Sequence, residues 1–288
     1  MGFLFFSILS ATCIFIIFRY FEKFEINNVN AIFINYLTAF IFGISISGPD
    51  IFELPTSKST WIILALIIGI LFVLVFFIMA KSTQIAGITV SSIATKMSVI
   101  IPMTFSIVYY HEQLYLVKIL AIAMAPIGVF LVVVKRNKRK ETLNKFSLPI
   151  LLFLGAGLID SLLKYVQASH LQNGNVLVFS TYLFFIAMLT SYLSRLFLKN
   201  GNRNKISKKD IIGGLILGLV NFGSLSFIIL ALRESGLDSS LLFGINNIGI
   251  ILLSIISGII LFKEKLSPIN WIGIFVSIVT LFLLFNAG

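Results

Sequence analysis

Long apolar runs alternate with short polar connections along the whole chain. A helix needs about 20 largely apolar residues to cross the hydrocarbon core of a bilayer. Ten runs of suitable length occur, each bounded by charged residues or by clusters of Gly, Pro, Asn and Ser. The runs are continuous and do not alternate in strands of about 10 residues, which argues against a β-barrel. The predicted spans are residues 2–19, 30–48, 60–80, 86–109, 115–134, 147–166, 176–198, 211–231, 239–262 and 268–286.

The composition supports a membrane protein. Of the 288 residues, 58% are hydrophobic and 11% are charged, whereas a globular domain carries roughly a quarter charged residues. This composition leaves too little polar surface to cover a water-soluble particle, and so excludes a soluble enzyme, a disordered protein and a disulfide scaffold. With one cysteine, Cys13, and two histidines, the chain lacks the residues for a Cys/His metal site. We expect no metal and no cofactor.

The placement of the basic residues predicts an orientation. Counted together with the span ends beside them, the loops after the first, third, fifth, seventh and ninth spans carry 2, 1, 6, 6 and 2 Lys or Arg, which is 17 of the 22 in the chain. The other loops carry four, and Lys96 lies within a span. Cytoplasmic loops are enriched in Lys and Arg. The basic loops are therefore predicted in the cytoplasm of a bacterial inner (plasma) membrane, with both termini outside. This topology accounts for the net charge of +11 without a nucleic-acid partner.

The two halves of the sequence resemble each other. At an offset of 145, residues 18–20 (Phe-Arg-Tyr) align with residues 163–165 (Leu-Lys-Tyr). At an offset of 152, residues 111–114 (His-Glu-Gln-Leu) align with residues 263–266 (Lys-Glu-Lys-Leu). Five spans per half is an odd number, so the second half enters the membrane from the opposite side. Such an inverted-topology repeat is the architecture of many secondary transporters.

The fold class follows from the spans and the repeat. We predict an all-α polytopic membrane protein whose ten transmembrane helices form a 5+5 inverted repeat. Residues 1–134 form the first five-helix repeat, residues 135–146 a basic cytoplasmic linker, and residues 147–288 the second five-helix repeat. The protein is expected to be a monomer or a homodimer surrounded by membrane lipids.

At this level the chain resembles EamA-type permeases of the drug/metabolite transporter superfamily. The resemblance rests on ten spans in a 5+5 arrangement, on the Glu-x-Leu at residues 112–114 and 264–266, and on Trp271-Ile272-Gly273. It covers the whole chain and implies alternating-access transport of a small metabolite through a central cavity between the halves. Many relatives place their termini in the cytoplasm, whereas the charge distribution here predicts the reverse.

Ionisable residues inside the spans are the first candidates for function, because a charge at helix centre costs roughly 2.5–3.5 kcal/mol on insertion scales. Lys96 lies near the middle of the fourth span. It is either an anchor for an anionic or carboxylate-bearing substrate, or a structural partner of Asp160. Asp160 and Lys164 share one face of the sixth span. They form either a proton-coupling site or a structural ion pair in which Lys164 extends to the interface.

Other polar residues give weaker signals. An offset of 151 aligns Asn247 with Lys96, so Asn246 and Asn247 are candidates for lining a substrate site; amides at this depth also form bonds between helices. Arg19 occupies the place in the first repeat that Lys164 has in the second. Glu112 and Glu264 are expected to accept hydrogen bonds from the N-termini of the helices that follow them.

Two backbone features belong to the predicted helices themselves. Gly214 and Gly218 form a G-x-x-x-G spacing, which favours close helix packing. Pro102 and Pro126 are predicted to interrupt the fourth and fifth spans, as kinks or hinges.

A secondary transporter is the function class that these features favour, possible substrates being an amino acid, a nucleobase-like or a drug-like compound. The chain has no G-x-x-x-x-G-K-[ST] motif, so direct use of ATP is not encoded. The alternatives are a membrane-embedded enzyme acting on a lipid-like substrate and a non-transporting channel or scaffold. An enzyme is disfavoured because the spans contain neither paired acids nor H-E-x-x-H.

Overall fold

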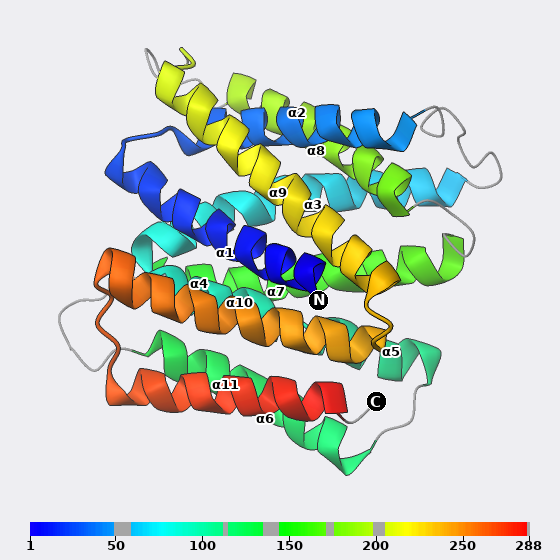
Figure 1. Ribbon diagram of the computed structural model, residues 1–288, viewed down its shortest axis with the longest axis vertical. Helices are drawn as coiled ribbons and strands as arrows, with labels where there is room; N and C mark the ends of the chain where they lie inside the picture. The colour runs from blue at the N-terminus through cyan, green and yellow to red at the C-terminus, as the bar shows by residue number, and fades with distance from the viewer. Residues whose placement is uncertain (49–58, 112–114, 135–143, 171–175, 198–204, 287–288) are drawn as a thin grey trace.

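The computed structural model describes residues 1–48, 59–111, 115–134, 144–170, 176–197 and 205–286 (Figure 1). Within these ranges the regular structure is helical, and no strand occurs. The first half contains α1 (Gly2–Lys23), α2 (Asn28–Ser47), α3 (Ser59–Ile85), α4 (Ile88–Met97), α5 (Ile100–Tyr110) and α6 (Leu116–Val133). The second half contains α7 (Asn144–His170), α8 (Val176–Phe197), α9 (Lys208–Glu234), α10 (Ser239–Phe262) and α11 (Pro268–Asn286).

The helices confirm the predicted apolar segments. In the described part of the chain, nine helical segments are long and apolar enough to cross a membrane. One of them, Ile88–Tyr110, combines α4 and α5, so the fourth predicted span is two short helices in line. The remaining predicted segment, residues 176–198, is the 22-residue α8. The prediction of a helical, polytopic membrane protein is therefore confirmed.

Helices α7 and α9 begin three residues before the predicted apolar runs, and for α9 a polar cap explains the start. Helix α9 begins at Lys208, three residues before the predicted start, since Ser207 and Asp210 form a capping box. Helix α7 begins at Asn144. The predicted linker, residues 135–146, therefore overlaps this helix, and residues 135–143 lie outside the described residues.

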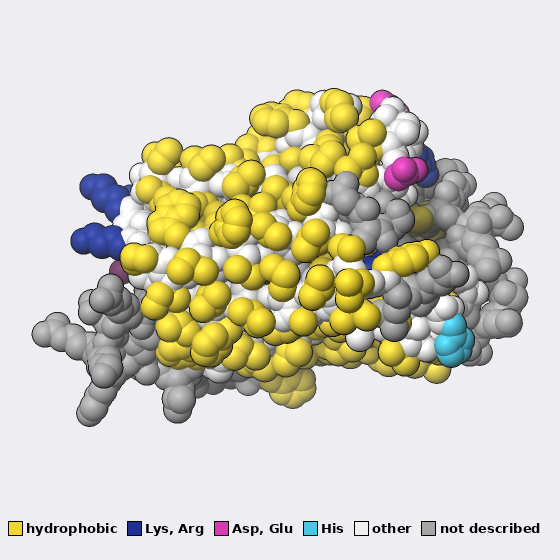
Figure 2. All heavy atoms as spheres, turned by 90° about the horizontal axis from the view of Figure 1, so that it is seen from below, with side chains coloured by type: hydrophobic (Ala, Val, Ile, Leu, Met, Phe, Trp, Pro, Cys, Tyr) yellow, Lys and Arg dark blue, Asp and Glu magenta, His cyan; other side chains and the backbone are white. Residues whose placement is uncertain are grey.

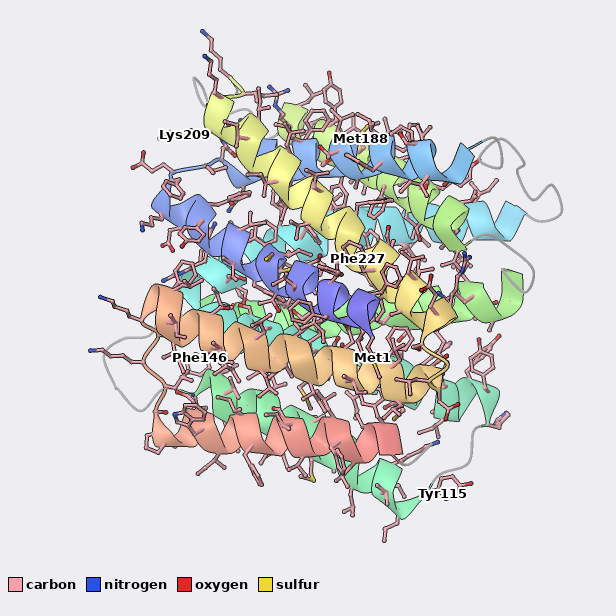
Figure 3. All side chains as sticks on the ribbon, in the orientation of Figure 1. Met1, Tyr115, Phe146, Met188, Lys209 and Phe227 are labelled. Atoms are coloured by element: carbon pink, nitrogen blue, oxygen red, sulfur yellow. The ribbon has the colours of Figure 1, made fainter. Side chains whose placement is uncertain are left out.

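The helices lie side by side and alternate in direction (Figure 1). One end of the bundle, on the left in Figure 1, is where α1, α3, α6, α8 and α10 end and α2, α4, α7, α9 and α11 begin. We call it the basic end, because most of the described Lys and Arg are at or next to these helix termini: Arg19, Lys23, Lys81, Arg195, Lys205, Lys208, Lys209, Lys263 and Lys265. Lys209 projects beyond the start of α9, whereas Tyr115 is at the opposite end (Figure 3).

Helix α4 occupies the centre of the packing. It contacts α1, α3, α6, α7, α10 and α11. Outside it, α2 packs against α8 and α9, and α6 packs against α11. Gly214 and Gly218 of α9 lie directly against α2, where added Cβ atoms would come within 2.5 Å of Ile34 Cβ and 2.6 Å of Thr38 Cβ. The predicted close packing at this G-x-x-x-G spacing is therefore confirmed.

The outer surface between the two ends is apolar. Ile63 is 58% exposed, Phe130 62% and Phe275 69%. Figure 2 shows hydrophobic side chains over most of one such face, with Lys or Arg at its left end. A continuous apolar surface of this kind would be unfavourable in water. It is the surface expected of helices that face lipid tails.

Candidate functional site

Lys96 lies in the last turn of α4, next to the point where the fourth span breaks. The break has a local cause. Pro102 has no backbone N–H and cannot continue the hydrogen-bond ladder to Ser98; Ile101 N donates to Ser98 O instead, at 2.9 Å. Helix C-termini carry negative partial charge and unpaired carbonyl groups. Ser98 and Val99 keep right-handed helical backbone angles, so the break is confined to the hydrogen-bond ladder. It leaves the half-buried Lys96 in the last turn of α4, where the backbone favours a cation.

Asp160 of α7 is the acid that the structure brings to Lys96. Helices α4 and α7 pack together, and the two side chains interact electrostatically across this contact. Gly157, one turn before Asp160, allows the approach, because a Cβ at this position would overlap the Ile101 side chain of α5. The two side chains are near enough to interact electrostatically, but they form no ion pair within 4.0 Å among the contacts of the described residues, so a direct Lys96–Asp160 pair stays a prediction.

A polar stripe on α7 connects Asp160 with the end of the bundle opposite the basic end. Asp160, Lys164 and Gln167 recur at helical spacing and are all exposed. Leu154 marks a different exposed face, which lies roughly 120° around the helix axis from Asp160 at 3.6 residues per turn. Asp160 faces α4 inside the bundle. The exposed side chains of this stripe therefore do not belong to the apolar outer surface of the bundle. The Asp160 side chain thus lies on an exposed polar face of α7 that is separate from its apolar outer face.

Asn246 and Asn247 lie on α10, which packs against α4. Asn246 is 7% exposed, and its Oδ1 accepts no hydrogen bond from the described residues. A buried polar atom left unpaired costs about 1–3 kcal/mol. Asn247 is half-buried. The amide oxygen of Asn246 is thus a buried acceptor without a partner among the described residues, and no hydrogen bond of those residues joins it to Lys96 or Asp160.

Hydroxyl groups on α4 are a feature that the sequence analysis missed. Ser92, Thr95 and Ser98 donate to carbonyl groups of their own helix, at 3.1, 2.8 and 2.5 Å. Their oxygens remain able to accept further hydrogen bonds. The signal was present in the sequence, because residues 88–98 carry five Ser or Thr within a predicted span.

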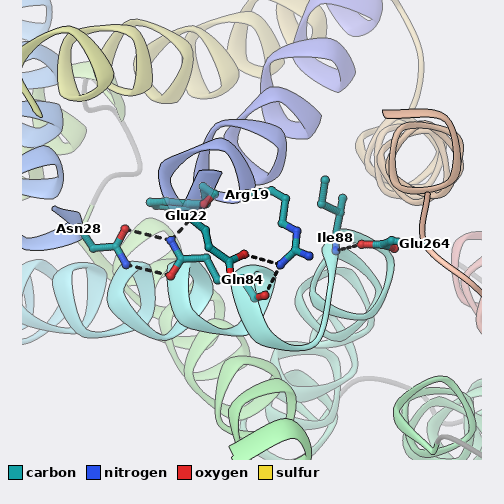
Figure 4. Close-up of polar contacts among 7 residues, drawn as sticks. Arg19, Glu22, Asn28, Gln84, Ile88 and Glu264 are labelled. Carbon is teal, nitrogen blue, oxygen red and sulfur yellow. Dashed lines mark hydrogen bonds and ion pairs between the residues drawn. The ribbon is translucent and has the colours of Figure 1, made fainter. Parts of the chain in front are cut away.

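Arg19 does not join Lys96 and Asp160. It lies near the end of α1 at the basic end, where Nη1 forms an ion pair with Glu22 Oε2 at 2.7 Å and donates to Gln84 O of α3 (Figure 4). The Gln84 side chain donates to Phe18 O at 3.1 Å and pairs with the amide of Asn28. Arg19 therefore links helix ends, and its sequence match with Lys164 does not correspond to a shared place in the site.

The prediction for Glu264 was wrong in its partner. Glu264 Oε1 accepts from Ile88 N at 2.6 Å and Oε2 from Thr89 N at 3.3 Å, so the carboxylate caps α4 in the other half (Figure 4). The following helix, α11, is capped by Ser267 and Asn270 instead. The turn at Lys263, with φ 53°, directs the chain back from α10 to this position. Glu112 lies outside the described residues.

Together these features define a polytopic helical membrane protein with two opposite charges inside the bundle, and comparisons place it among known chains. A Haemophilus influenzae (strain ATCC 51907 / DSM 11121 / KW20 / Rd) protein described as uncharacterized is 32% identical over 290 residues, covering 98% of this chain and 97% of its own length. The chain belongs to the same family as that protein. No family model matches the chain. A crystal structure with 12% sequence identity superposes with a TM-score of 0.64, covering 98% of this chain and 94% of the other, and shares the fold.

Proposed function

We propose that the protein is a secondary transporter that moves a small charged metabolite by alternating access. The observation that carries the proposal is the pair of opposite charges, Lys96 and Asp160, beside a helix broken at membrane depth. Broken helices that present charged groups and free backbone groups near the midplane are typical of transporter substrate sites. Charges at this depth are costly, and those that are present mark substrate or ion paths.

The packing of the helices supports the inverted repeat on which alternating access depends. The equivalent helices α2 and α8 pack against each other, as do α6 and α11. The contact of α1 with α9 has its counterpart in that of α7 with α3, and the contact of α1 with α10 in that of α7 with α4. Figure 1 shows α1 and α7 running in opposite directions. His111 and Lys263, aligned at the offset of 152, both have left-handed backbones that end their helices, with φ 55° and 53°.

This architecture is that of the EamA-type permeases of the drug/metabolite transporter superfamily, which we propose as the wider group. We further propose that the membrane is a bacterial inner membrane, with the basic end in the cytoplasm.

The site favours a substrate with separated opposite charges. The Lys96 ammonium can bind a carboxylate and the Asp160 carboxylate an amine. The free Asn246 Oδ1 adds an acceptor for an N–H group. Amino acids have this combination of groups, and we propose them as the first class of compounds to test.

A thermal-shift screen of the purified protein tests the site. A ligand that binds the folded state raises its apparent stability by mass action. We expect an amino acid to raise the melting temperature and nucleobases, sugars and cationic drugs to have less effect. Lys96→Met should abolish the shift, whereas Lys209→Met, which removes an exposed lysine at the basic end, should preserve it. A shift that survives Lys96→Met would remove Lys96 from the site.

Uptake of the same compound into proteoliposomes tests transport and its coupling. Wild-type protein should accumulate the compound, and a pH gradient should drive accumulation when protons are coupled. We expect Asp160→Asn to abolish the pH-driven part. Unchanged pH-driven uptake by Asp160→Asn would show that this carboxylate does not carry the proton.

A further inference from the structure

Three polar contacts hold the middle of the bundle together at the basic end. Arg19 of α1 bonds to the end of α3 through Gln84 O, the Gln84 side chain returns to Phe18 O of α1, and Glu264 binds the start of α4 (Figure 4). We call these contacts the basic-end clasp. It joins α1, α3 and α4 of the first half to the end of α10 in the second half.

The Glu264 contact is the part of the clasp that crosses between the halves. Its carboxylate satisfies two of the N–H groups that a helix start leaves unpaired, and its negative charge lies at the positive end of α4. Gly87 and Gly258 make room for it, since Cβ atoms at these positions would come within 2.6 Å of Oε1 and Oε2 respectively. Gly87 also has φ 105°, a conformation that favours glycine. Gly87 and Gly258 thus leave space on both sides of the Glu264 carboxylate.

The opposite side of the central site is built differently. Beyond Asp160, the inner face of α7 continues with the exposed, polar Lys164 and Gln167 toward the end opposite the clasp. In the other direction, the same face carries Ala156, which is buried, and the half-buried Phe153. Along α7, the site is therefore bordered by apolar packing toward the basic end and by exposed polar groups toward the other end.

We propose that the basic-end clasp is a closed gate, and that the structure is the state in which the Lys96–Asp160 site is reached from the opposite end along α7. The inference rests on the proposed transport function. Opening the site toward the basic end requires the Glu264 carboxylate to leave the start of α4. Two arrangements of the same bundle, clasp formed and clasp open, then provide the two states that alternating access needs.

Cysteine labelling tests the gate without measuring transport. In a Cys13→Ser background, Ser92→Cys reports on the α4 segment between Lys96 and Glu264, since Ser92 is buried, and Gln167→Cys reports on the exposed stripe. A membrane-impermeant maleimide is added to permeabilised membranes, so that it reaches both faces of the protein. We expect rapid labelling of Gln167→Cys and little labelling of Ser92→Cys.

Glu264→Gln should then shift the two states. Glutamine keeps the shape, loses the charge and turns an N–H group toward one of the two backbone donors. We expect labelling of Ser92→Cys to rise about tenfold, the effect of losing one charge-assisted hydrogen bond from the closed state, while labelling of Gln167→Cys falls. Gln84→Met, which breaks the clasp elsewhere, should act in the same direction. Glu25→Gln, an exposed acid at the same end, should leave both reporters unchanged.

Two results would overturn the gate. One is equal labelling of Ser92→Cys and Gln167→Cys in the parent, which would mean that the basic end is open. The other is a parallel rise at both reporters, or no change at either, in Glu264→Gln and Gln84→Met, which would make the clasp a structural joint. Either result leaves the thermal-shift and uptake tests of transport intact, and a failed uptake assay leaves the labelling result intact.

Discussion

Lys96 is accommodated at membrane depth by the backbone of a very short helix. Helix α4 has 10 residues, and each end of its dipole faces a complementary charge: the Glu264 carboxylate at the start and the Lys96 ammonium in the last turn. Each such interaction contributes about 0.3–1 kcal/mol when exposed and more when partly buried. The electrostatic interaction with Asp160 adds to this. A charged lysine at this position is therefore favoured by the helix dipole and by the negative charge of Asp160.

The unpaired amide of Asn246 gives a prediction that separates binding from folding. Asn246→Leu keeps the branched shape of the side chain, at a larger volume, and removes a buried acceptor that has no described partner. We expect the melting temperature to stay the same or to rise, by the equivalent of about 1 kcal/mol, while the ligand-induced thermal shift is lost. A drop in stability of the ligand-free variant would instead show that the amide holds helices together.

The sequence drew attention to the charged residues inside the spans, but it did not reveal the polar residues that join helix ends. Lys96 and Asp160 could be found from sequence because a charge within an apolar run has a high cost and so carries information. Gln84, Asp210 and Asn270 could not, because a polar residue at the end of a span looks like an ordinary loop residue. Their partners lie far along the chain: Asn270 Nδ2 donates to Val132 O at 2.7 Å, a pairing that no local pattern encodes.

At the scale of the helices, the structure differs from the predicted spans at the break between α4 and α5. Hydrophobic length predicted one span over residues 86–109, and the segment Ile88–Tyr110 is long and apolar enough to be one. Both prolines were predicted to interrupt their spans. Pro102 does so, with the break one turn before it, whereas α6 continues through Pro126. A proline alone therefore does not determine a break. Its surroundings decide, and Ser98 and Val99 are where the ladder changes.

These two prolines form a matched pair for testing the break. Pro102→Ala restores a backbone donor and should allow α4 and α5 to join; thermal stability should rise by less than the about 3 kcal/mol of a helix-interior proline, because Pro102 lies in the first turn of α5. We expect the transport rate to fall several-fold, since Lys96 loses the helix end beside it. Pro126→Ala should also raise thermal stability, and it should leave the transport rate unchanged. Thermal unfolding and proteoliposome uptake, measured on both variants, check this.

The opposite pattern would contradict a role for the break. If Pro102→Ala and Pro126→Ala had the same effect on uptake, the break would be a packing feature of the fourth span with no part in the site.

At the scale of the whole molecule, the halves are joined at the basic end on both sides of the clasp. Asp210 of the second half accepts from Asn27 N and Asn30 Nδ2 of the first, both at 2.9 Å. On the far side, Asn270 of α11 binds the end of α6 through Val132 O and Val134 O. These joints lie at α2–α9 and α6–α11, outside the central helices. Opening at the basic end is therefore confined to the middle, where the clasp lies.

The orientation of the whole bundle gives the last prediction. The described basic residues gather at one end, and Lys or Arg near the ends of spans are retained in the cytoplasm. A reporter enzyme active only outside the cytoplasm, fused after Gly288, should be active, and a fluorescent protein that matures only in the cytoplasm should be dark there. Fusions after Lys205, at the basic end, should give the reverse and serve as the control. If both fusion sites reported the arrangement opposite to this, the gate formed by Glu264 would close the site from the outside, and the state described here would be open to the cytoplasm.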